Sequence, residues 1–427
     1  MNNQTLLSGV RAVELATYVA GPTVGRMLTH FGASVIKVED VADGDYWRMM
    51  GSLYNLPDDE LENPLFDQYN SRKRDICLNL KTTEGREVLL KLLAEADVFI
   101  VNVRERSLKK LGLDYETLRE RFPRLIYAQI TGYGDTGPDK DLPAFDTSAF
   151  WAASGFINDA SLITPDGFHQ PVDTPASVGD TTTGLTLYGA VMTALYARER
   201  TGCGDRVTAS LFGTALWVMA HMTIGTQERY GRQYPRTHAT CTPPPFRCAD
   251  GNWIVIALLT SWARDFPRFC KVIGRPELSD DPRFHDAVTF VKPENAKALA
   301  EVLDAVFLEK TAEEWKHCFD ENGLVCALVG HFKDIFHSAQ ALENQFIQPF
   351  TAPSGGKCFV TIPSPRSDRM KVESFQRGPL LGEHTVEILR ELNYSDENIQ
   401  RLLTTGSVRQ HPPGGPEAQE QYGGPST

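Results

Sequence analysis

The sequence lacks the short motifs that mark common cofactor, metal and hydrolase sites. Its eight cysteines include no C-x-x-C pair, which excludes the usual zinc and dithiol redox motifs. Its ten histidines include no H-x-x-x-H pair, so no zinc site of that kind is predicted. The turn after the first expected strand has no G-x-G-x-x-G, and no G-x-S-x-G elbow occurs. Nicotinamide-dependent hydride transfer, serine hydrolysis and metal catalysis therefore find no support, and we expect no metal ligands.

The sequence also has none of the features of a secreted, membrane or nucleic-acid-binding chain. The start, MNNQTLLSGV, lacks the charged region and apolar run of a signal peptide. No apolar run reaches the roughly 18 residues of a membrane span. The net charge of −12 disfavours nucleic acid or an anionic membrane as the main partner. We expect a cytoplasmic protein with reduced thiols, no membrane and no nucleic acid.

The first 130 residues alternate short apolar strands with amphipathic helices. The expected strands are Val10–Leu15, Ser34–Glu39, Ile76–Leu80, Asp97–Val103 and Leu125–Ile130. Repeated β-α units of this kind predict an α/β fold with a parallel sheet.

The remaining chain predicts a second, smaller domain and a return to the first. Long helices are expected over Thr181–Arg200 and from Phe212 to about Tyr230, followed by a linker at Pro235–Pro245. The predicted organisation is a large domain at 1–230, a linker and small domain at 231–330, a return segment at 331–408 and a disordered tail at 409–427. The tail is rich in Pro, Gly and Gln, a composition typical of disorder.

A segment of about fifty residues with little helix or strand pattern follows the strand that ends at Ile130. Long structureless segments inside compact domains are usually functional or disordered, and the aromatic residues here argue against disorder. We interpret it as an active-site loop whose aspartates could serve as nucleophile, acid or base. Chemistry alone does not rank Asp146 above Asp166. Asp180 is expected to be a helix N-cap and therefore structural.

A basic cluster stands beside the expected strand ends. Its members are Lys37, Arg72, Lys73, Arg74, Lys109 and Lys110. Such charges could bind the phosphates of a nucleotide-like ligand, or they could form an ordinary solvated surface.

Six groups of short motifs occur in order over roughly residues 8–408: GVRAVEL with AGP, VIKVE, ADV with NV, GYGDTGP, RTG with GD, and PLLGEHT. Together they resemble the class III CoA-transferases, a family that includes formyl-CoA transferase and carnitine CoA-transferase. The segments PDKDLPAFDTSAFWA and VGDTTTGLTL are most similar to the branch that acts on aromatic or branched 2-hydroxy acids and enoates, such as phenyllactate and 2-hydroxyisocaproate.

The resemblance implies a Rossmann-like large domain built from both chain ends, a smaller α/β domain and an interlocked homodimer. It implies exchange of CoA between an acyl-CoA and a free acid, with coenzyme A as substrate and no permanently bound cofactor. An aspartate would form a mixed anhydride and then an aspartyl-CoA thioester.

The resemblance also implies roles for particular residues. The segment Thr164–Gly167 best matches the family's Asp-Gly turn, which makes Asp166 the nucleophile and Asp146 its rival. Backbone groups of Val19 and Ala20 would meet the reacting carbonyl. The positions that match CoA contacts are Lys73, Arg74, Asn102, Lys110 and Tyr133.

Two alternatives stay open at this point. An acyl-CoA α-epimerase would share the fold but transfer a proton at the α-carbon. A CoA-binding protein without catalysis would bind CoA and exchange nothing.

Overall fold

The computed structural model describes residues 5–160, 162–163, 169–230, 245–257, 261–372 and 374–412. The chain divides into two compact units. The large unit comprises residues 1–155, 174–220 and 338–427, and the small unit comprises 156–173 and 221–337.

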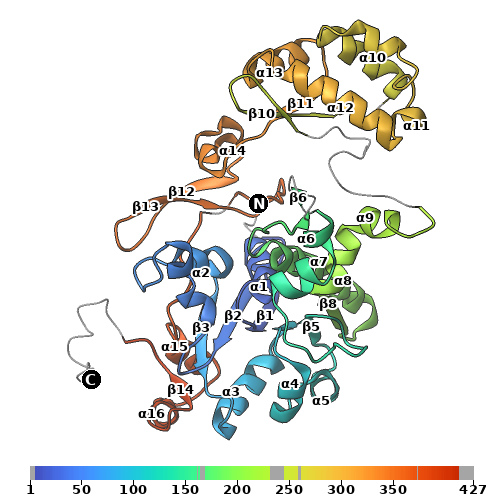
Figure 1. Cartoon of the computed structure of the whole chain (residues 1–427). Coiled ribbons are helices and arrows are strands. Elements are labelled where there is room, and N and C mark those ends of the chain that lie inside the picture. The colour runs from blue at the N-terminus through green and yellow to red at the C-terminus, as the bar shows by residue number, and fades with distance from the viewer. Residues whose placement is uncertain are drawn as a thin grey trace. The chain divides into compact units, whose positions relative to one another are not determined.

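The large unit is built on a seven-stranded sheet with the order β14-β3-β2-β1-β4-β5-β8 (Figure 1). Its strands are β1 (Arg11–Leu15), β2 (Ser34–Glu39), β3 (Arg74–Leu78), β4 (Val98–Val101), β5 (Ile126–Thr131), β8 (Arg206–Ser210) and β14 (Val408–Arg409). Every neighbouring pair is parallel except β14 and β3, where Val408 pairs antiparallel with Leu78. The predicted α/β class with a mostly parallel sheet is confirmed.

Helices connect these strands and cover both faces of the sheet. They are α1 (Ala20–His30), α2 (Pro64–Asn70), α3 (Thr83–Ala94), α4 (Glu105–Leu111), α5 (Tyr115–Arg121), α7 (Val178–Thr201), α8 (Leu211–Val218), α15 (Thr385–Glu391) and α16 (Asp396–Thr404). A further short helix of the large unit is α14 (Ala339–Glu343). Three shorter helical turns are the 3₁₀ segments η1 (Tyr46–Met49) and η2 (Gly51–Tyr54) and the π-helix η3 (Asp146–Ala152). The strands β12 (Ile347–Thr351) and β13 (Lys357–Thr361) form an antiparallel hairpin.

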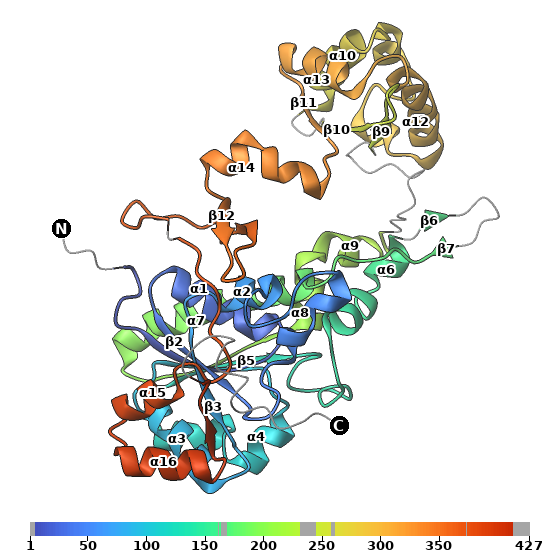
Figure 2. The same cartoon turned by 90° about the vertical axis from the view of Figure 1, so that its left-hand side faces the viewer.

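Alternate residues of each central strand enter two separate cores. In β4, Val98 and Ile100 pack against α1 and α7, whereas Phe99 and Val101 pack against α3, α5, α15 and α16. Figure 2 shows α3, α15 and α16 gathered together beside β3. Because both faces are buried, β4 is apolar at every position rather than at every second one.

The small unit has its own apolar core. A three-stranded antiparallel sheet with the order β11-β10-β9 packs against the surrounding helices. Its elements are α6 (Phe156–Asp159), β6 (Leu162–Ile163), β7 (His169–Gln170), β9 (Phe246–Arg247), β10 (Trp253–Ala257), α10 (Trp262–Val272), η4 (Pro276–Asp280), α11 (Ala287–Phe290), α12 (Pro293–Phe307), α13 (Ala312–Glu321), β11 (Val325–Leu328) and η5 (Phe332–His337). Stacked rings such as Trp262 and Phe266, 4.3 Å apart, fill its interior.

Some predicted elements differ from the observed ones. The long helix expected from Phe212 to about Tyr230 is instead α8 followed by α9 (Ala220–Gly225), with a break at Met219. Most of the predicted linker, residues 231–244, lies outside the described residues. No helix in the described parts of the chain is both long and apolar enough to cross a lipid bilayer.

Candidate functional site

The carboxylate of Asp146 is buried at the start of η3, where it accepts hydrogen bonds from three groups. Its Oδ2 atom accepts from the Trp151 indole N–H at 3.2 Å and from the Ser177 backbone N–H at 3.0 Å, and its Oδ1 accepts from the Asp180 backbone N–H at 3.0 Å. The first N–H groups of a helix have no partner within the helix. Asp146 therefore caps α7 from a different part of the chain.

Asp180 lies inside the first turn of α7, so its predicted role as N-cap is wrong. The N-cap residue is Ser177, which has a left-handed backbone (φ 68°) and makes no side-chain capping bond. Ser177 and Asp180 match the S-x-x-D spacing that marks a helix start. That pattern could have placed the helix boundary correctly.

The Asp180 carboxylate is half-buried, and no described residue donates a hydrogen bond to it. Burial and the nearby charge of Asp146 raise the pKa of Asp180 to about 7. Burial raises the pKa of Asp146 as well, although its N–H donors act in the opposite direction. Carboxylates with strongly perturbed pKa values are concentrated at functional sites. Sequence reasoning missed Asp180, and it is the strongest nucleophile candidate among the described aspartates.

Two glycines let other groups approach this part of α7. A Cβ atom on Gly179 would lie 2.2 Å from Asp146 Oδ1, and one on Gly184 would lie 2.5 Å from the Ala20 carbonyl oxygen. The hydroxyl of Tyr69, on α2, lies 3.3 Å from Thr181 Oγ1. The start of α7 is thus packed against both η3 and the start of α1.

The turn between β1 and α1 is held by side chains from two other segments. Asn102 Oδ1 accepts from the Thr17 N–H at 3.1 Å, and its Nδ2 donates to the Thr17 carbonyl at 2.7 Å. Asp45 Oδ1 accepts from the Tyr18 N–H at 2.9 Å. Tyr18 has a φ of 63°, a left-handed conformation that is unfavourable for a bulky residue unless its surroundings hold it. The backbone of Val19 and Ala20 is therefore fixed at the carboxyl end of β1.

A buried ion cluster lies beside this turn and includes Lys73, one of the predicted CoA contacts. Lys73 Nζ donates to both Glu14 carboxylate oxygens at 2.9 and 2.8 Å, and to the carbonyl of Pro22 and Oδ1 of Asn70. Lys37 forms a second buried ion pair, 2.8 Å from Asp45. The side chain of Lys73 has no exposed surface, so it supports the fold and cannot reach a ligand phosphate directly.

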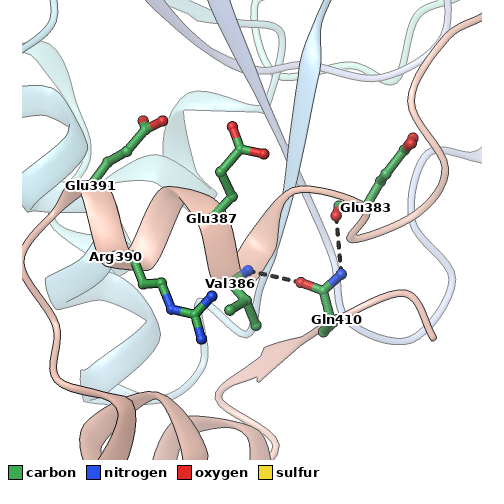
Figure 3. Close-up of a pocket in the computed structure, with 6 residues that line it drawn as sticks. All are labelled: Glu383, Val386, Glu387, Arg390, Glu391 and Gln410. Atoms are coloured by element: carbon green, nitrogen blue, oxygen red, sulfur yellow. Dashed lines mark hydrogen bonds between the residues drawn. The ribbon is translucent and has the colours of Figure 1, made fainter. Parts of the chain in front are cut away.

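Arg74, another predicted contact, lies beside an acidic pocket. Its guanidinium pairs with Glu387 at 2.8 Å and Glu391 at 2.6 Å. Figure 3 shows the side chains lining this pocket of about 600 Å³: Glu383, Val386, Glu387, Arg390, Glu391 and Gln410. Its three carboxylates outnumber Arg390, the one cationic side chain among the lining residues, which makes the pocket a poor site for the phosphates of CoA. We therefore do not assign CoA binding to this pocket.

The other predicted residues are distributed around the carboxyl edge of the sheet. Tyr133 follows β5 and packs against Phe212, with ring centroids 6.2 Å apart, and Lys110 is exposed near the end of α4. Asn102 follows β4 directly, but its amide is occupied by Thr17. Asp166 lies outside the described residues.

Comparison with known proteins identifies the family. The model of CoA-transferase family III matches residues 7–385. The chain is 36% identical over 408 residues to (R)-2-hydroxy-4-methylpentanoate CoA-transferase of Clostridioides difficile, covering 95% of this chain and all of that protein. It is 34% identical to cinnamoyl-CoA:phenyllactate CoA-transferase of Clostridium sporogenes, covering 94% and 97% of the two chains.

Solved structures of other proteins also resemble this chain. An aspartate-to-alanine variant of Rv3272 from Mycobacterium tuberculosis superimposes with a TM-score of 0.78 at 29% identity, covering 91% of this chain and 99% of the other. A CAIB/BAIF family protein from Brucella suis gives a TM-score of 0.74 at 30% identity, with 91% and 99% coverage. The chain is a member of CoA-transferase family III.

Proposed function

We propose that this enzyme exchanges CoA between an acyl-CoA and a free carboxylic acid, with Asp180 as the nucleophile. The observation that carries this assignment is the half-buried Asp180 carboxylate, which has no described hydrogen-bond donor and a pKa raised to about 7. Asp146 is a weaker candidate because its carboxylate is occupied by three N–H donors. A nucleophile needs an available lone pair, and Asp180 has one.

The proposed reaction proceeds through four acyl transfers. Asp180 attacks the thioester carbonyl, the C–S bond breaks, and CoA leaves as a thiolate with a mixed anhydride on the enzyme. The thiolate attacks the aspartyl carbonyl of the anhydride, which releases the first acid and leaves an aspartyl-CoA thioester. The second acid attacks this thioester and expels the thiolate, which then takes the new acyl group and restores Asp180. These steps replace one difficult exchange by several reactions that each have a lower barrier, and no step requires a metal ion.

The start of α1 is suited to stabilising the oxyanions of these steps. The first N–H groups of the helix have no intrahelical partner, and Val19, at the N-cap, makes no side-chain capping bond. Oriented backbone N–H groups aimed at a developing oxyanion are among the largest contributions to catalysis. Because Ala20 packs against Gly184 of α7, this helix start lies about one helical turn from Asp180 along α7. We therefore assign the oxyanion contacts to the backbone of Val19 and Ala20.

For the substrates, we propose a 2-hydroxy or unsaturated acid with an aromatic or branched side chain. The names of the two transferase relatives above support this class. We keep Lys110, which is exposed on α4, and the half-buried Tyr133, which follows β5, as the proposed CoA contacts.

We also propose the interlocked homodimer. Exposed apolar side chains on α7 and α8, namely Leu185, Tyr196 and Trp217, support a protein contact there. The molar mass in solution, measured by light scattering, tests this part of the proposal.

The α-epimerase alternative is not favoured, since the relatives above are named as transferases. It predicts incorporation of deuterium from heavy water at the α-carbon of an acyl-CoA in the absence of any acceptor acid. A CoA-binding protein without catalysis would bind CoA tightly and exchange nothing.

The deciding experiment is to trap the acyl-enzyme. The enzyme is incubated with an aryl or branched acyl-CoA, quenched with hydroxylamine, and digested for peptide mapping by mass spectrometry. Hydroxamate at Asp180 is expected, and D180N should give neither hydroxamate nor exchange. Hydroxamate at Asp166 or Asp146 would move the nucleophile to that residue, and exchange without any trapped aspartate would reject the covalent mechanism.

A further inference from the structure

A group of aromatic rings surrounds Tyr18 in the turn that precedes α1. The Tyr46 ring stacks on Tyr18 with centroids 6.4 Å apart and planes 23° apart, and the Phe145 ring meets Tyr18 edge-on at 5.6 Å. The three rings come from three separate segments of the large unit. We call Tyr18, Tyr46 and Phe145 the ring cluster.

The ring cluster is continuous with the carboxylates of the site. On one side, Phe145 directly precedes Asp146, whose carboxylate bonds the backbone of Asp180. On the other side, the Tyr18 ring packs against Trp47 and the Trp47 ring packs against Tyr69, each pair with centroids 6.3 Å apart. The hydroxyl of Tyr69 lies beside Thr181. The ring contacts therefore run from Phe145, which precedes Asp146, to Tyr69, which lies beside the residue that follows Asp180.

The outer rings of the cluster are partly open to solvent. Phe145 is 57% exposed and Tyr46 is 49% exposed, although both touch the half-buried Tyr18. Apolar surface beside a reactive group is where small-molecule sites bury the apolar part of a ligand. Aromatic rings also favour stacked or edge-on contacts with another ring.

The charges near the ring cluster limit what it can accept. Among the described cation–ring contacts, none involves Tyr18, Tyr46 or Phe145. The nearby lysines Lys37 and Lys73 are fully buried in ion pairs. Neither lysine is available to pair with a second carboxylate at the far end of a substrate, and burying such a carboxylate against the rings would cost its hydration.

We propose that the ring cluster binds the uncharged side chain of the transferred acyl group and selects aryl and branched-alkyl acids over small acids and dicarboxylic acids. This inference rests on the proposed function and adds the residues that set its substrate class. Phe145, at the edge of the cluster beside Asp146, is the main specificity-determining residue, and Tyr46 is the second.

The experiment compares acids with one fixed acyl-CoA donor. Values of kcat/KM are measured for an aryl 2-hydroxy acid, a branched 2-hydroxy acid, a short unbranched 2-hydroxy acid and a dicarboxylic acid. F145A removes a ring that is mostly exposed, and the backbone bonds of Phe145 to Ser148 do not involve that ring, so folding should survive. F332A, which truncates a ring that is 92% exposed, is the matched control.

For F145A, the preference for the aryl acid over the short acid should fall about 10- to 200-fold, the range that apolar pocket contacts provide. Y46A should change the preference in the same direction, and F332A should leave it unchanged. An equal loss for all four acids, or an unchanged preference in both variants, would overturn the assignment of the ring cluster. No exchange with any acid in the wild-type enzyme would instead reject the proposed function.

Discussion

The Oδ1 atom of Asp146 accepts a 3.0 Å hydrogen bond from the backbone N–H of Asp180, so one carboxylate holds the peptide that carries the other. The bond fixes the start of α7, and the charge of Asp146 raises the pKa of the Asp180 carboxyl. A single residue therefore acts on both the position and the protonation of the proposed nucleophile.

D146N should lower the midpoint of the pH–rate profile. Only ionised Asp180 can attack the thioester, so wild-type kcat/KM should rise with pH through a midpoint near 7. Removing the negative charge of Asp146 removes one of the two causes of the raised pKa, so ionisation moves to lower pH. The exposed Asp141 provides the control D141N, whose midpoint should match the wild type. An unchanged midpoint in D146N would contradict the coupling.

G179A should disrupt the site through a steric clash. The added Cβ would lie 2.2 Å from Asp146 Oδ1 and 2.3 Å from the Phe150 ring, so one of them must move. We expect a loss of roughly 1–3 kcal/mol in the free energy of unfolding together with a large fall in kcat. G189A on the same helix is the control, because a Cβ there meets nothing within 4 Å. G189A should gain up to about 1 kcal/mol, and equal behaviour of the two variants would refute the argument.

Substitutions of Lys73 and Lys110, both predicted from the sequence to contact CoA, should have different effects. The first should reduce stability and the second should weaken binding of the acyl-CoA. K73M leaves the buried Glu14 without its closest cation and should destabilise the fold by about 3–5 kcal/mol, measured by urea denaturation. K110A should leave stability unchanged and raise KM for the acyl-CoA. A stable K73M with a raised KM for acyl-CoA would return Lys73 to the ligand site.

The sequence predicted the sheet well because its strands carry their own signal. An unbroken apolar run such as VFIV in β4 indicates a strand buried on both faces, and repeated β-α units favour parallel order.

The site was less predictable because its contacts join distant residues. Asp180 stands before three threonines, a local pattern typical of a helix N-cap. The side chain that actually caps α7 is that of Asp146, 34 positions earlier. Lys73 stands in a basic run typical of a solvated surface, yet Glu14, 59 positions away, makes it a buried ion-pair residue. A local pattern reports charge and propensity, and neither fixes burial or long-range partners.

N102A should distinguish positioning from direct CoA binding. The Asn102 amide makes two hydrogen bonds to Thr17, and these hold the turn that places Val19 and Ala20. Without them the oxyanion contacts should shift, so kcat should fall roughly 10- to 100-fold, whereas KM for the acyl-CoA should change little. The exposed Asn398 on α16 provides the control N398A, which should behave as the wild type. If N102A instead raises KM for the acyl-CoA and leaves kcat intact, Asn102 contacts CoA directly and its bonds to Thr17 are incidental to catalysis.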